Sequence, residues 1–174
     1  SRGGDQVLVE RSLPSIAALR GRPVAITPST LGPFLLSRAL NAHGLGLGDV
    51  ELRPMPLEAM PQALARRDVV AAALFPPFSD AAMRGAPVRP LFTSREIPGQ
   101  IFDVLVVDPK YLREHAVRVN NLLRSWQAAH DAARRNPMHA QRLMAQRELV
   151  TVAEFKKSEQ GLVYFSLAEQ QSML

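Results

Sequence analysis

The stretch that decides the fold is Pro23–Phe34, PVAITPSTLGPF. Its first five residues, 23–27, are apolar or β-branched and predict a short buried strand. Pro28 ends that strand, and a helix is expected over about 33–43, with Gly44 as its stop. The apolar positions of this helix recur with a period of 3.6 residues: Leu31, Phe34, Leu35, Ala39 and Ala42. A buried strand that leads directly into an amphipathic helix is typical of α/β layer proteins.

The same alternation continues to about residue 108. The run VVAAALF at 69–75 contains no polar residue, as expected for a parallel strand that is covered on both faces. The first two-thirds of the chain therefore predict an α/β fold with a mostly parallel sheet flanked by helices. The remaining strands are expected at 7–9, 50–53, 88–92 and 101–107. The remaining helices are expected at 58–67 and, after the break at Pro76-Pro77, through Met83 with an end at Gly85.

From residue 109 the pattern becomes helical. A long helix is expected to end near Asn136, and Asn136-Pro137 is typical of the start of another helix, through Met144. Thr151-x-x-Glu154 and Ser166-x-x-Glu169 have the spacing of capping boxes, each of which begins a helix. The long helix carries one apolar stripe: Val119, Leu122, Leu123, Trp126, Ala129 and Ala133.

The composition excludes several classes of protein. Hydrophobic residues make up 47% of the 174, which is enough for a packed core and excludes wholesale disorder. There is no cysteine, so disulfides, thiolate zinc sites and cysteine nucleophiles are excluded, and an exported protein would suit this composition. No apolar run is long enough to span a bilayer, and the polar residues Ser1–Asp5 do not form a signal peptide.

The junction between the expected strand and helix contains a candidate ligand site. Ser29 and Thr30 supply two hydroxyl groups, and the amides of Thr30, Leu31 and Gly32 are expected to be free at the positive end of the helix. Such a junction, at the carboxyl edge of a sheet, suits a small anion. The alternative is that Ser29 or Thr30 is only the N-cap of the helix.

A second candidate follows the strand at 69–75. Phe75-Pro76-Pro77-Phe78 places aromatic and rigid side chains at the end of this strand, where they could line a pocket. The alternative is a strand-to-helix turn whose rings belong to the core. The two interpretations are compatible, because the wall of a pocket is also packed.

The sequence gives little support for metal binding, catalysis or nucleic-acid binding. His43, His115, His130 and His139 form neither an HExxH motif nor an i,i+4 pair, so we expect no metal site and no cofactor. No GxSxG motif or local carboxylate pair is present, so we expect no enzyme and assign no catalytic residue. The net charge of +5 is compatible with nucleic-acid binding. The arginines are dispersed, however, and no nucleic-acid-binding motif accompanies them, so we expect no nucleic-acid partner.

The order of several motifs resembles a known family. The segments are Ser1–Asp5, Leu19–Ile26 with Pro28–Thr30, Asp68–Pro77 (DVVAAALFPP), Phe92–Ser94 with Pro98-Gly99, and Asp103–Val107. Together they are similar to the second lobe of periplasmic solute-binding proteins of ABC transporters, of the sulfonate/nitrate/taurine type (NMT1/SsuA-like). The resemblance covers most of the chain.

The resemblance implies a type II periplasmic-binding-protein-like lobe with an α-helical C-terminal extension. It implies an ABC-importer component that is periplasmic, or extracytoplasmic and anchored to the membrane. This component binds a small anionic solute, like a sulfonate, nitrate or taurine, without catalysis and delivers it to a membrane permease. Carried over, Ser29 and Thr30 contact the head of the solute, with Leu31 and Gly32 beside them, and Phe75 and Pro76 line the cleft. Val70 replaces an acidic family residue and Phe75-Pro76 a Trp-Glu pair, which leaves the identity of the solute open.

The resemblance also implies a division of the chain. Residues 1–11 are expected to be an interlobe crossover, 12–108 the ligand-binding lobe, and 109–174 a truncated helical extension. The expected helices would then fold back, pair with another copy or swap between chains to cover their apolar stripe. Two alternatives on the same fold remain: the effector-binding domain of a LysR-type regulator, and a pyrimidine-precursor synthase-like enzyme.

Overall fold

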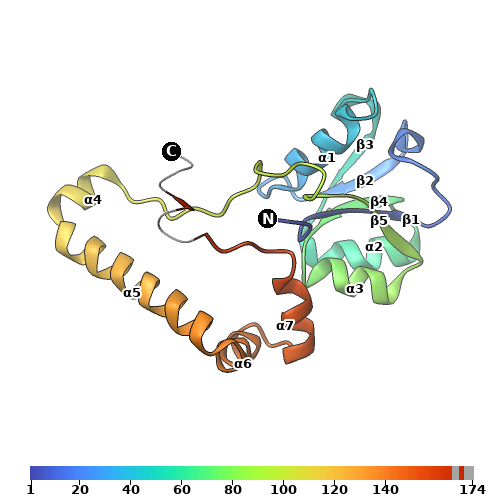
Figure 1. Ribbon diagram of the computed structural model, residues 1–174. Coiled ribbons are helices and arrows are strands. Elements are labelled where there is room, and N and C mark those ends of the chain that lie inside the picture. The colour runs from blue at the N-terminus through green and yellow to red at the C-terminus, as the bar shows by residue number, and fades with distance from the viewer. Residues whose placement is uncertain (166–168, 171–174) are drawn as a thin grey trace. The chain divides into compact units, whose positions relative to one another are not determined.

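The computed structural model describes residues 1–165 and 169–170. The chain divides into two compact units (Figure 1). The first contains Ser1–Phe102 together with the described residues from Gln160 onward, and the second is Asp103–Glu159.

The first unit is built on a five-stranded sheet with the order β3-β2-β4-β1-β5. β2 pairs in parallel with both β3 and β4, whereas β1 pairs antiparallel with both β4 and β5. Four of the five described strands therefore point the same way, which confirms the mostly parallel sheet that the sequence predicts. The strands are β1 (Gln6–Glu10), β2 (Pro23–Ile26), β3 (Glu51–Pro54), β4 (Ala71–Leu74) and β5 (Val88–Thr93).

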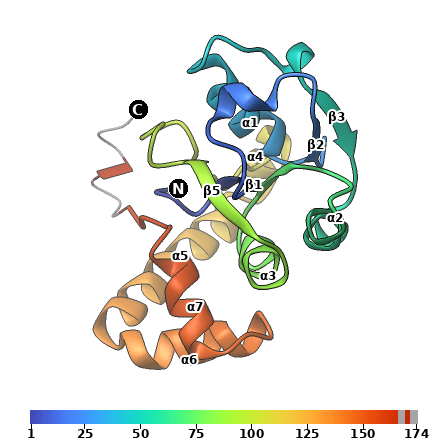
Figure 2. The same cartoon turned by 90° about the vertical axis from the view of Figure 1, so that its right-hand side faces the viewer.

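Helices cover both faces of this sheet. α1 (Gly32–Asn41) lies on one face, and α2 (Met60–Arg66) and α3 (Phe78–Gly85) lie on the other (Figure 2). The strands contribute alternate side chains to the two cores, as the period of two in a strand requires. Val7 and Val9 pack with α1, while Leu8 packs with α2 and α3.

The connections follow the signals in the sequence. Pro61 lies in the first turn of α2, where its missing N–H costs no helical hydrogen bond. Gly44 has a φ of +71° just after α1, so it ends that helix as expected. The strands predicted around residues 7–9, 23–27, 50–53, 69–75 and 88–92 are all present. Three connections contain short 3-10 helices, at Ile16–Leu19, Leu47–Asp49 and Leu57–Ala59.

Residues 1–11, the expected crossover, contain β1, which lies between β4 and β5 in the sheet. This segment therefore forms part of the lobe that it leads into. Its polar side chains at residues 5 and 6 lie at the end of the sheet where β4 ends, because β1 is antiparallel to β4.

The second unit is helical, as its sequence predicts. Its helices are α4 (Pro109–Glu114), α5 (Ala116–Arg135), α6 (Pro137–Arg147) and α7 (Val152–Glu159). The side chain of Asn136 accepts a hydrogen bond from the amide of His139 and caps α6. The first predicted capping box is confirmed, because Thr151 and Glu154 exchange hydrogen bonds at 2.8–3.2 Å. Ser166 of the second lies outside the described residues.

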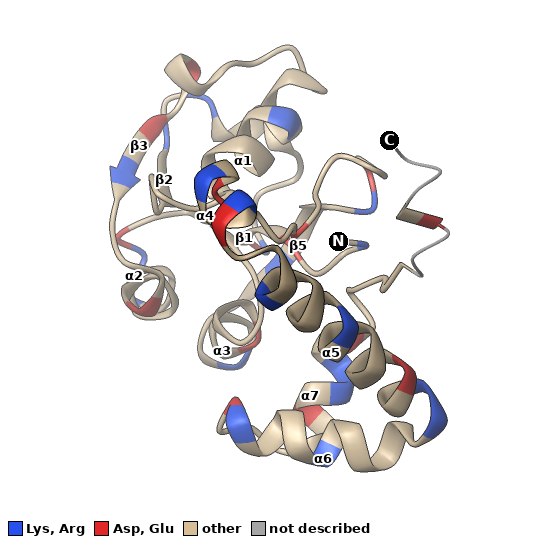
Figure 3. Ribbon diagram, turned by 90° about the vertical axis from the view of Figure 1, so that its left-hand side faces the viewer, with Lys and Arg blue, Asp and Glu red and all other residues tan. Residues whose placement is uncertain are grey.

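The large side chains of the apolar stripe of α5, Leu122, Leu123 and Trp126, are exposed. Association of copies through this stripe stays a prediction. Lys and Arg residues are found along the helices of both units (Figure 3). No helix in the described part of the chain is long and apolar enough to cross a membrane.

The strand predicted at 101–107 is wrong. These residues have no regular secondary structure, and Val104 and Val106 are 74% and 81% exposed. The run IFDVLVV has the side chains that strands favour, but a strand forms only when a neighbouring strand completes its hydrogen bonds. No described strand pairs with this segment.

Candidate functional site

Two strand-to-helix corners lie side by side in the first unit. β2 leads to α1 and β4 leads to α3 through Phe75-Pro76-Pro77. β2 and β4 are parallel neighbours, with Val24 opposite Ala71 and Ala25 opposite Ala72. Their carboxyl ends therefore meet at one end of the sheet, which we call the carboxyl edge. Open α/β sheets take ligands at this edge.

The corner after β2 is closed by Thr30. Its amide and its hydroxyl both donate to the carbonyl oxygen of Thr27, at 3.1 and 2.8 Å. The hydroxyl oxygen also accepts a hydrogen bond from the amide of Gly32, at 3.2 Å. The expectation that the amides of Thr30 and Gly32 are free is therefore wrong. A short hydroxyl side chain at a helix start can satisfy the first amides itself, and Thr30 does so here.

Several donors of this corner remain open among the described residues. The Ser29 hydroxyl is exposed and has no hydrogen-bond partner among the described residues. The amide of Leu31 likewise donates to no acceptor in the part of the chain that the structure describes. The first turn of α1 holds no acidic side chain, so the positive end of its dipole is not neutralised from within the helix. The open donors thus include the Ser29 hydroxyl and the Leu31 amide.

Gly32 brings α1 close to the sheet. A Cβ atom at this position would lie 3.3 Å from Thr30 Oγ1 and 3.4 Å from the carbonyl oxygen of Ala73 on β4. The residue is itself buried. Gly32 therefore positions the corner, and its own amide is used within the turn.

Phe75 and Pro76 lie at the end of β4, and both are half-buried. The ring of Phe75 packs edge-on against the ring of Phe78, with centroids 6.1 Å apart and planes at 80°. The carbonyl oxygen of Phe75 accepts a hydrogen bond from the amide of Ser79 and joins the corner to the first turn of α3. Phe75 thus packs against its neighbour and still presents part of its surface at the carboxyl edge.

The start of β1 also lies at this edge, which was not predicted from the sequence. β1 runs antiparallel to β4, so its first residue, Gln6, lies opposite Leu74, one residue before Phe75. On its other side, Gln6 lies opposite Thr93, the last residue of β5. Nothing in the local sequence of β1 indicates its direction, so no sequence signal was available to place Gln6 here.

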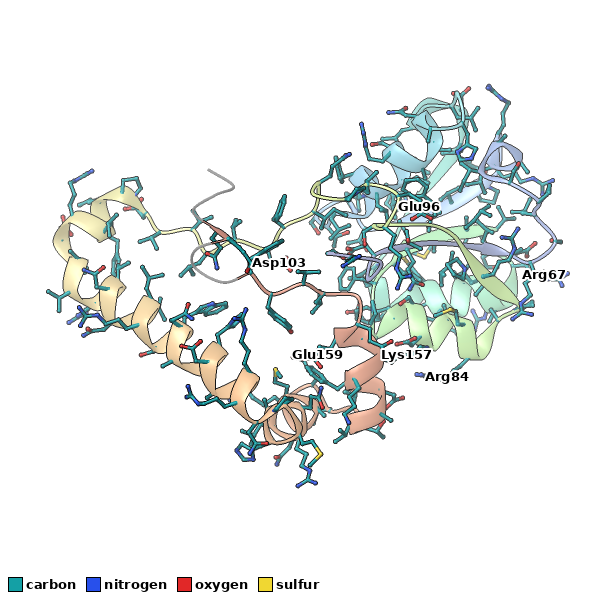
Figure 4. All side chains as sticks on the ribbon, in the orientation of Figure 1. Arg67, Arg84, Glu96, Asp103, Lys157 and Glu159 are labelled. Carbon is teal, nitrogen blue, oxygen red and sulfur yellow. The ribbon has the colours of Figure 1, made fainter. Side chains whose placement is uncertain are left out.

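The loop after β5 also lies at this edge. The Glu96 carboxylate accepts hydrogen bonds from the amide and hydroxyl of Thr93, at 3.1 and 2.6 Å. Arg95 is exposed and forms no ion pair with any described residue. Its side chain passes over Gly3, where a Cβ atom would lie 2.6 Å from Arg95 Nε. Figure 4 shows Glu96 and Arg67 at opposite ends of the sheet.

The geometry suits binding of a small polar solute. The edge offers hydroxyl and amide donors from Ser29 and Leu31, part of the ring of Phe75 and, in the loop after β5, the exposed cation of Arg95. Within residues 1–165 and 169–170, no group of three or more His, Cys, Asp or Glu side chains is placed to hold a metal ion.

A match to one protein-family profile shows which family this chain belongs to. The sequence profile of the NMT1-like family matches residues 9–149, which is most of the chain. The chain belongs to the NMT1-like family. This confirms the resemblance stated from the motifs. No curated protein sequence gives a significant match.

Solved structures place the NMT1-like chain in the expected fold. The periplasmic aliphatic sulphonate-binding protein SsuA from Escherichia coli is 21% identical, with a TM-score of 0.77 over 88% of this chain and 50% of that one. The alkanesulfonate-binding protein SsuA from Xanthomonas axonopodis pv. citri, bound to MOPS, is 18% identical, with a TM-score of 0.75 over 97% and 61%. The desulfurization enzyme DSZB is 17% identical, with a TM-score of 0.65 over 94% and 62%.

The chain thus spans about half to three-fifths of the length of these structures. At these identities, the likeness establishes the periplasmic-binding-protein fold of this NMT1-like chain. The lobe and its helical extension, predicted from the sequence, are confirmed at the level of fold class.

Proposed function

We propose that the first unit binds a small anionic solute, of the alkylsulfonate kind, at its carboxyl edge. Ser29 and the Leu31 amide would hold the anionic head, and Phe75 and Pro76 would contact the apolar part. Thr30 and Gly32 would shape the corner from beneath. The observation that carries this proposal is the parallel pairing of β2 with β4, because it brings the two corners together.

Charge and chemistry support an anion. The start of α1 carries the positive end of the helix dipole, and a bound anion there is stabilised by about 0.3–1 kcal/mol. Arg95 adds a cation at the same edge that forms no ion pair with a described residue. The names of two structural matches, a sulphonate-binding and an alkanesulfonate-binding protein, point to the same class of solute.

As part of this proposal, the whole protein is the solute-binding component of an ABC importer that works in the periplasm. Its partner would then be a membrane permease, to which it delivers the solute without changing it. Membership of the NMT1-like family and the periplasmic setting named for a structural match support this role.

Catalysis on the same solute is the second candidate, because one structural match is a desulfurization enzyme. Under the leading proposal, the solute leaves unchanged. Incubating the chain with an alkylsulfonate or an aromatic sulfinate and following the solute by proton NMR separates the two. Release of sulfite would favour the enzyme.

The binding proposal can be tested by NMR titration of the 174-residue chain, labelled with ¹⁵N, with ethanesulfonate and with ethylammonium. We expect saturable shifts of the Ser29 and Leu31 amides with the sulfonate and none with the cation. Because a hydrogen bond to a charged group is worth about 1.5–3 kcal/mol, Ser29→Ala should weaken sulfonate binding about 10-fold or more.

Ser37→Ala is the matched control. Ser37 lies in the second turn of α1, and its hydroxyl donates to the carbonyl oxygen of Phe34 at 2.9 Å. This variant should bind ethanesulfonate as the parent chain does. Equal losses in the two variants, or shifts that avoid the carboxyl edge, would contradict the proposal.

A further inference from the structure

Asp5 carries a carboxylate that is buried and has no partner among the described residues. The residue is only 6% exposed. No described group donates a hydrogen bond to the carboxylate or forms an ion pair with it. Glu96, the carboxylate in the loop after β5, differs, because it accepts from the amide and hydroxyl of Thr93. A buried charge is normally paired or hydrogen-bonded, so Asp5 needs a donor that the described residues do not supply.

The side chain of Asp5 lies on the face of the sheet that α1 covers. Side chains of β1 alternate between the two faces: Val7 packs with α1, and Leu8 packs with α2 and α3. The amide of Ser94 donates to the carbonyl oxygen of Asp5 at 2.9 Å, which extends the pairing of β1 with β5 by one residue. Because the alternation therefore continues through Asp5, this residue shares the face of Val7 and of the corner at Ser29.

Asp5 and the first turn of α1 lie beside the same residue of β4. That residue is Ala73, which pairs with Val7 on β1, so Asp5 is its diagonal neighbour on this face, at about 7–8 Å. A Cβ atom at Gly32 would lie 3.5 Å from the Cβ atom of Ala73. A tetrahedral oxyanion with one hydrogen bond on each side spans about 8 Å between its partners. One small anion can therefore contact both the start of α1 and the Asp5 carboxylate.

The Asp5 carboxylate keeps access to solvent. Within the described part of the chain, the fully enclosed side-chain atoms without a hydrogen-bond partner are Gln6 Oε1 and Ser79 Oγ. Neither oxygen of the Asp5 side chain is among them, although neither has a partner. The small exposure that Asp5 retains therefore includes its oxygens, and a solute at the carboxyl edge can reach them.

The groups at this edge make opposite demands on a solute. The hydroxyl of Ser29, the amide of Leu31 and the positive end of α1 attract an anion. The Asp5 carboxylate repels an anion, and it accepts a hydrogen bond only from a group that carries a proton. An oxyanion that keeps one acidic proton near neutral pH meets both demands.

We propose that Asp5 makes the carboxyl edge selective for a small oxyanion that retains a proton, such as the monoanion of an alkylphosphonate. This inference rests on the proposed function. In the bound state, the charged oxygens accept from Ser29 and Leu31, and the P–O–H group donates to the Asp5 carboxylate. A sulfonate has the same charge and tetrahedral shape but no proton, so it leaves Asp5 without a donor and places two negative charges side by side. Sulfonates therefore bind here more weakly than phosphonates do.

The test compares ethylphosphonate with ethanesulfonate. The 174-residue chain is titrated with each solute in slightly acidic buffer, in which the phosphonate keeps one proton, and the readout is the ratio of the two Kd values. A hydrogen bond to a charged group predicts a preference for the phosphonate of about 10-fold or more. Asp5→Asn removes the charge and keeps the shape of the side chain, so the preference should fall to about 2-fold. A parent preference below about 3-fold, or a fall of less than about 3-fold in the variant, would overturn the role of Asp5.

Asp68→Asn is the matched control. Asp68 is exposed and precedes β4, at the end of the sheet opposite to the carboxyl edge, so this variant makes the same change in net charge away from the site. It should keep the ratio of the parent chain. An equal fall in both variants would trace the effect to net charge and overturn the proposal.

A further measurement needs no variant. In methyl ethylphosphonate, a methyl group replaces the acidic proton, so this solute should bind the parent chain no more tightly than ethanesulfonate does. Binding as tight as that of ethylphosphonate would overturn the proposal.

The outcomes also separate this inference from the proposed function. Binding of both solutes with a ratio that does not depend on Asp5 overturns the role of Asp5 and leaves the solute-binding function standing. Absence of binding by either solute at millimolar concentration overturns both.

Discussion

The hydroxyl of Thr30 donates a hydrogen bond to the carbonyl oxygen of Thr27, at 2.8 Å, and accepts one from the amide of Gly32. These two bonds close the turn that joins β2 to α1. Thr30 thus builds the corner of the candidate site, while the hydroxyl of its neighbour Ser29 has no partner in the part of the chain that the structure describes. Two adjacent hydroxyl residues that look alike in sequence therefore have different roles.

Replacing Thr30 by valine should destabilise the first unit by about 1 kcal/mol, because the change keeps the shape of the side chain and leaves the Gly32 amide without an acceptor. The single tryptophan, Trp126, belongs to the other unit. The free energy of unfolding is therefore best taken from hydrogen exchange of the slowest amides in β1 and β4. Thr30→Ser keeps the hydroxyl and should preserve most of the stability. Equal losses in both variants would contradict this role.

Replacing Gly32 by alanine should also destabilise the first unit, by about 1 kcal/mol, because the new methyl group would press on Thr30 Oγ1 and on the carbonyl oxygen of Ala73. Gly48→Ala is the control, since a Cβ atom there meets no described atom within 4 Å. The same exchange measurement compares the two. A Gly32→Ala variant as stable as the Gly48→Ala variant would show that α1 does not need this close approach to β4.

Two buried serines should respond in opposite ways to replacement by alanine. The hydroxyl of Ser94 accepts from the amide of Gly3 at 2.7 Å, so Ser94→Ala should cost about 1–3 kcal/mol. The hydroxyl of Ser79 has no described partner, so Ser79→Ala should leave the stability unchanged or raise it by up to about 1 kcal/mol. Thermal unfolding followed by circular dichroism ranks the two variants. A lower melting temperature for Ser79→Ala than for Ser94→Ala would reverse the assignment.

Limited proteolysis should cut the chain first within 103–107. This segment joins the two units, lacks regular structure and exposes Val104 and Val106. Elastase, which cleaves after small apolar residues, should therefore cut there before it cuts in β2 or β4. Mass spectrometry of the first fragments locates the cut. Protection of this segment would mean that it pairs with another strand in solution.

The local elements could largely be predicted from the sequence. Pro28, Gly44 and Pro61 mark boundaries that the backbone respects, because their conformational limits act wherever the chain places them. The capping box at Thr151 and Glu154 likewise depends only on residues within one turn. The position of the candidate site, at the ends of the strands before residues 29 and 75, followed from the same local patterns.

The partners of each element could not be predicted in this way. The segment 101–107 has strand-forming residues, yet no described strand pairs with it. Gln6 has no distinctive neighbours in sequence, yet the antiparallel pairing of β1 puts it opposite Leu74. The use of the Thr30 hydroxyl within its own turn also escaped prediction, because a hydroxyl at a helix start can face either the backbone or a ligand.

By itself, the sequence determined where the chain is helical or extended in the α/β lobe and its helical extension, because these choices depend on local propensity and on the period of apolar residues. Only the tertiary structure decided that β1 runs against its neighbours and that Gln6, Phe75 and Ser29 share one edge. The physical reason is that strand pairing is made by hydrogen bonds between residues far apart in the chain, and local patterns do not encode the choice of partner or direction.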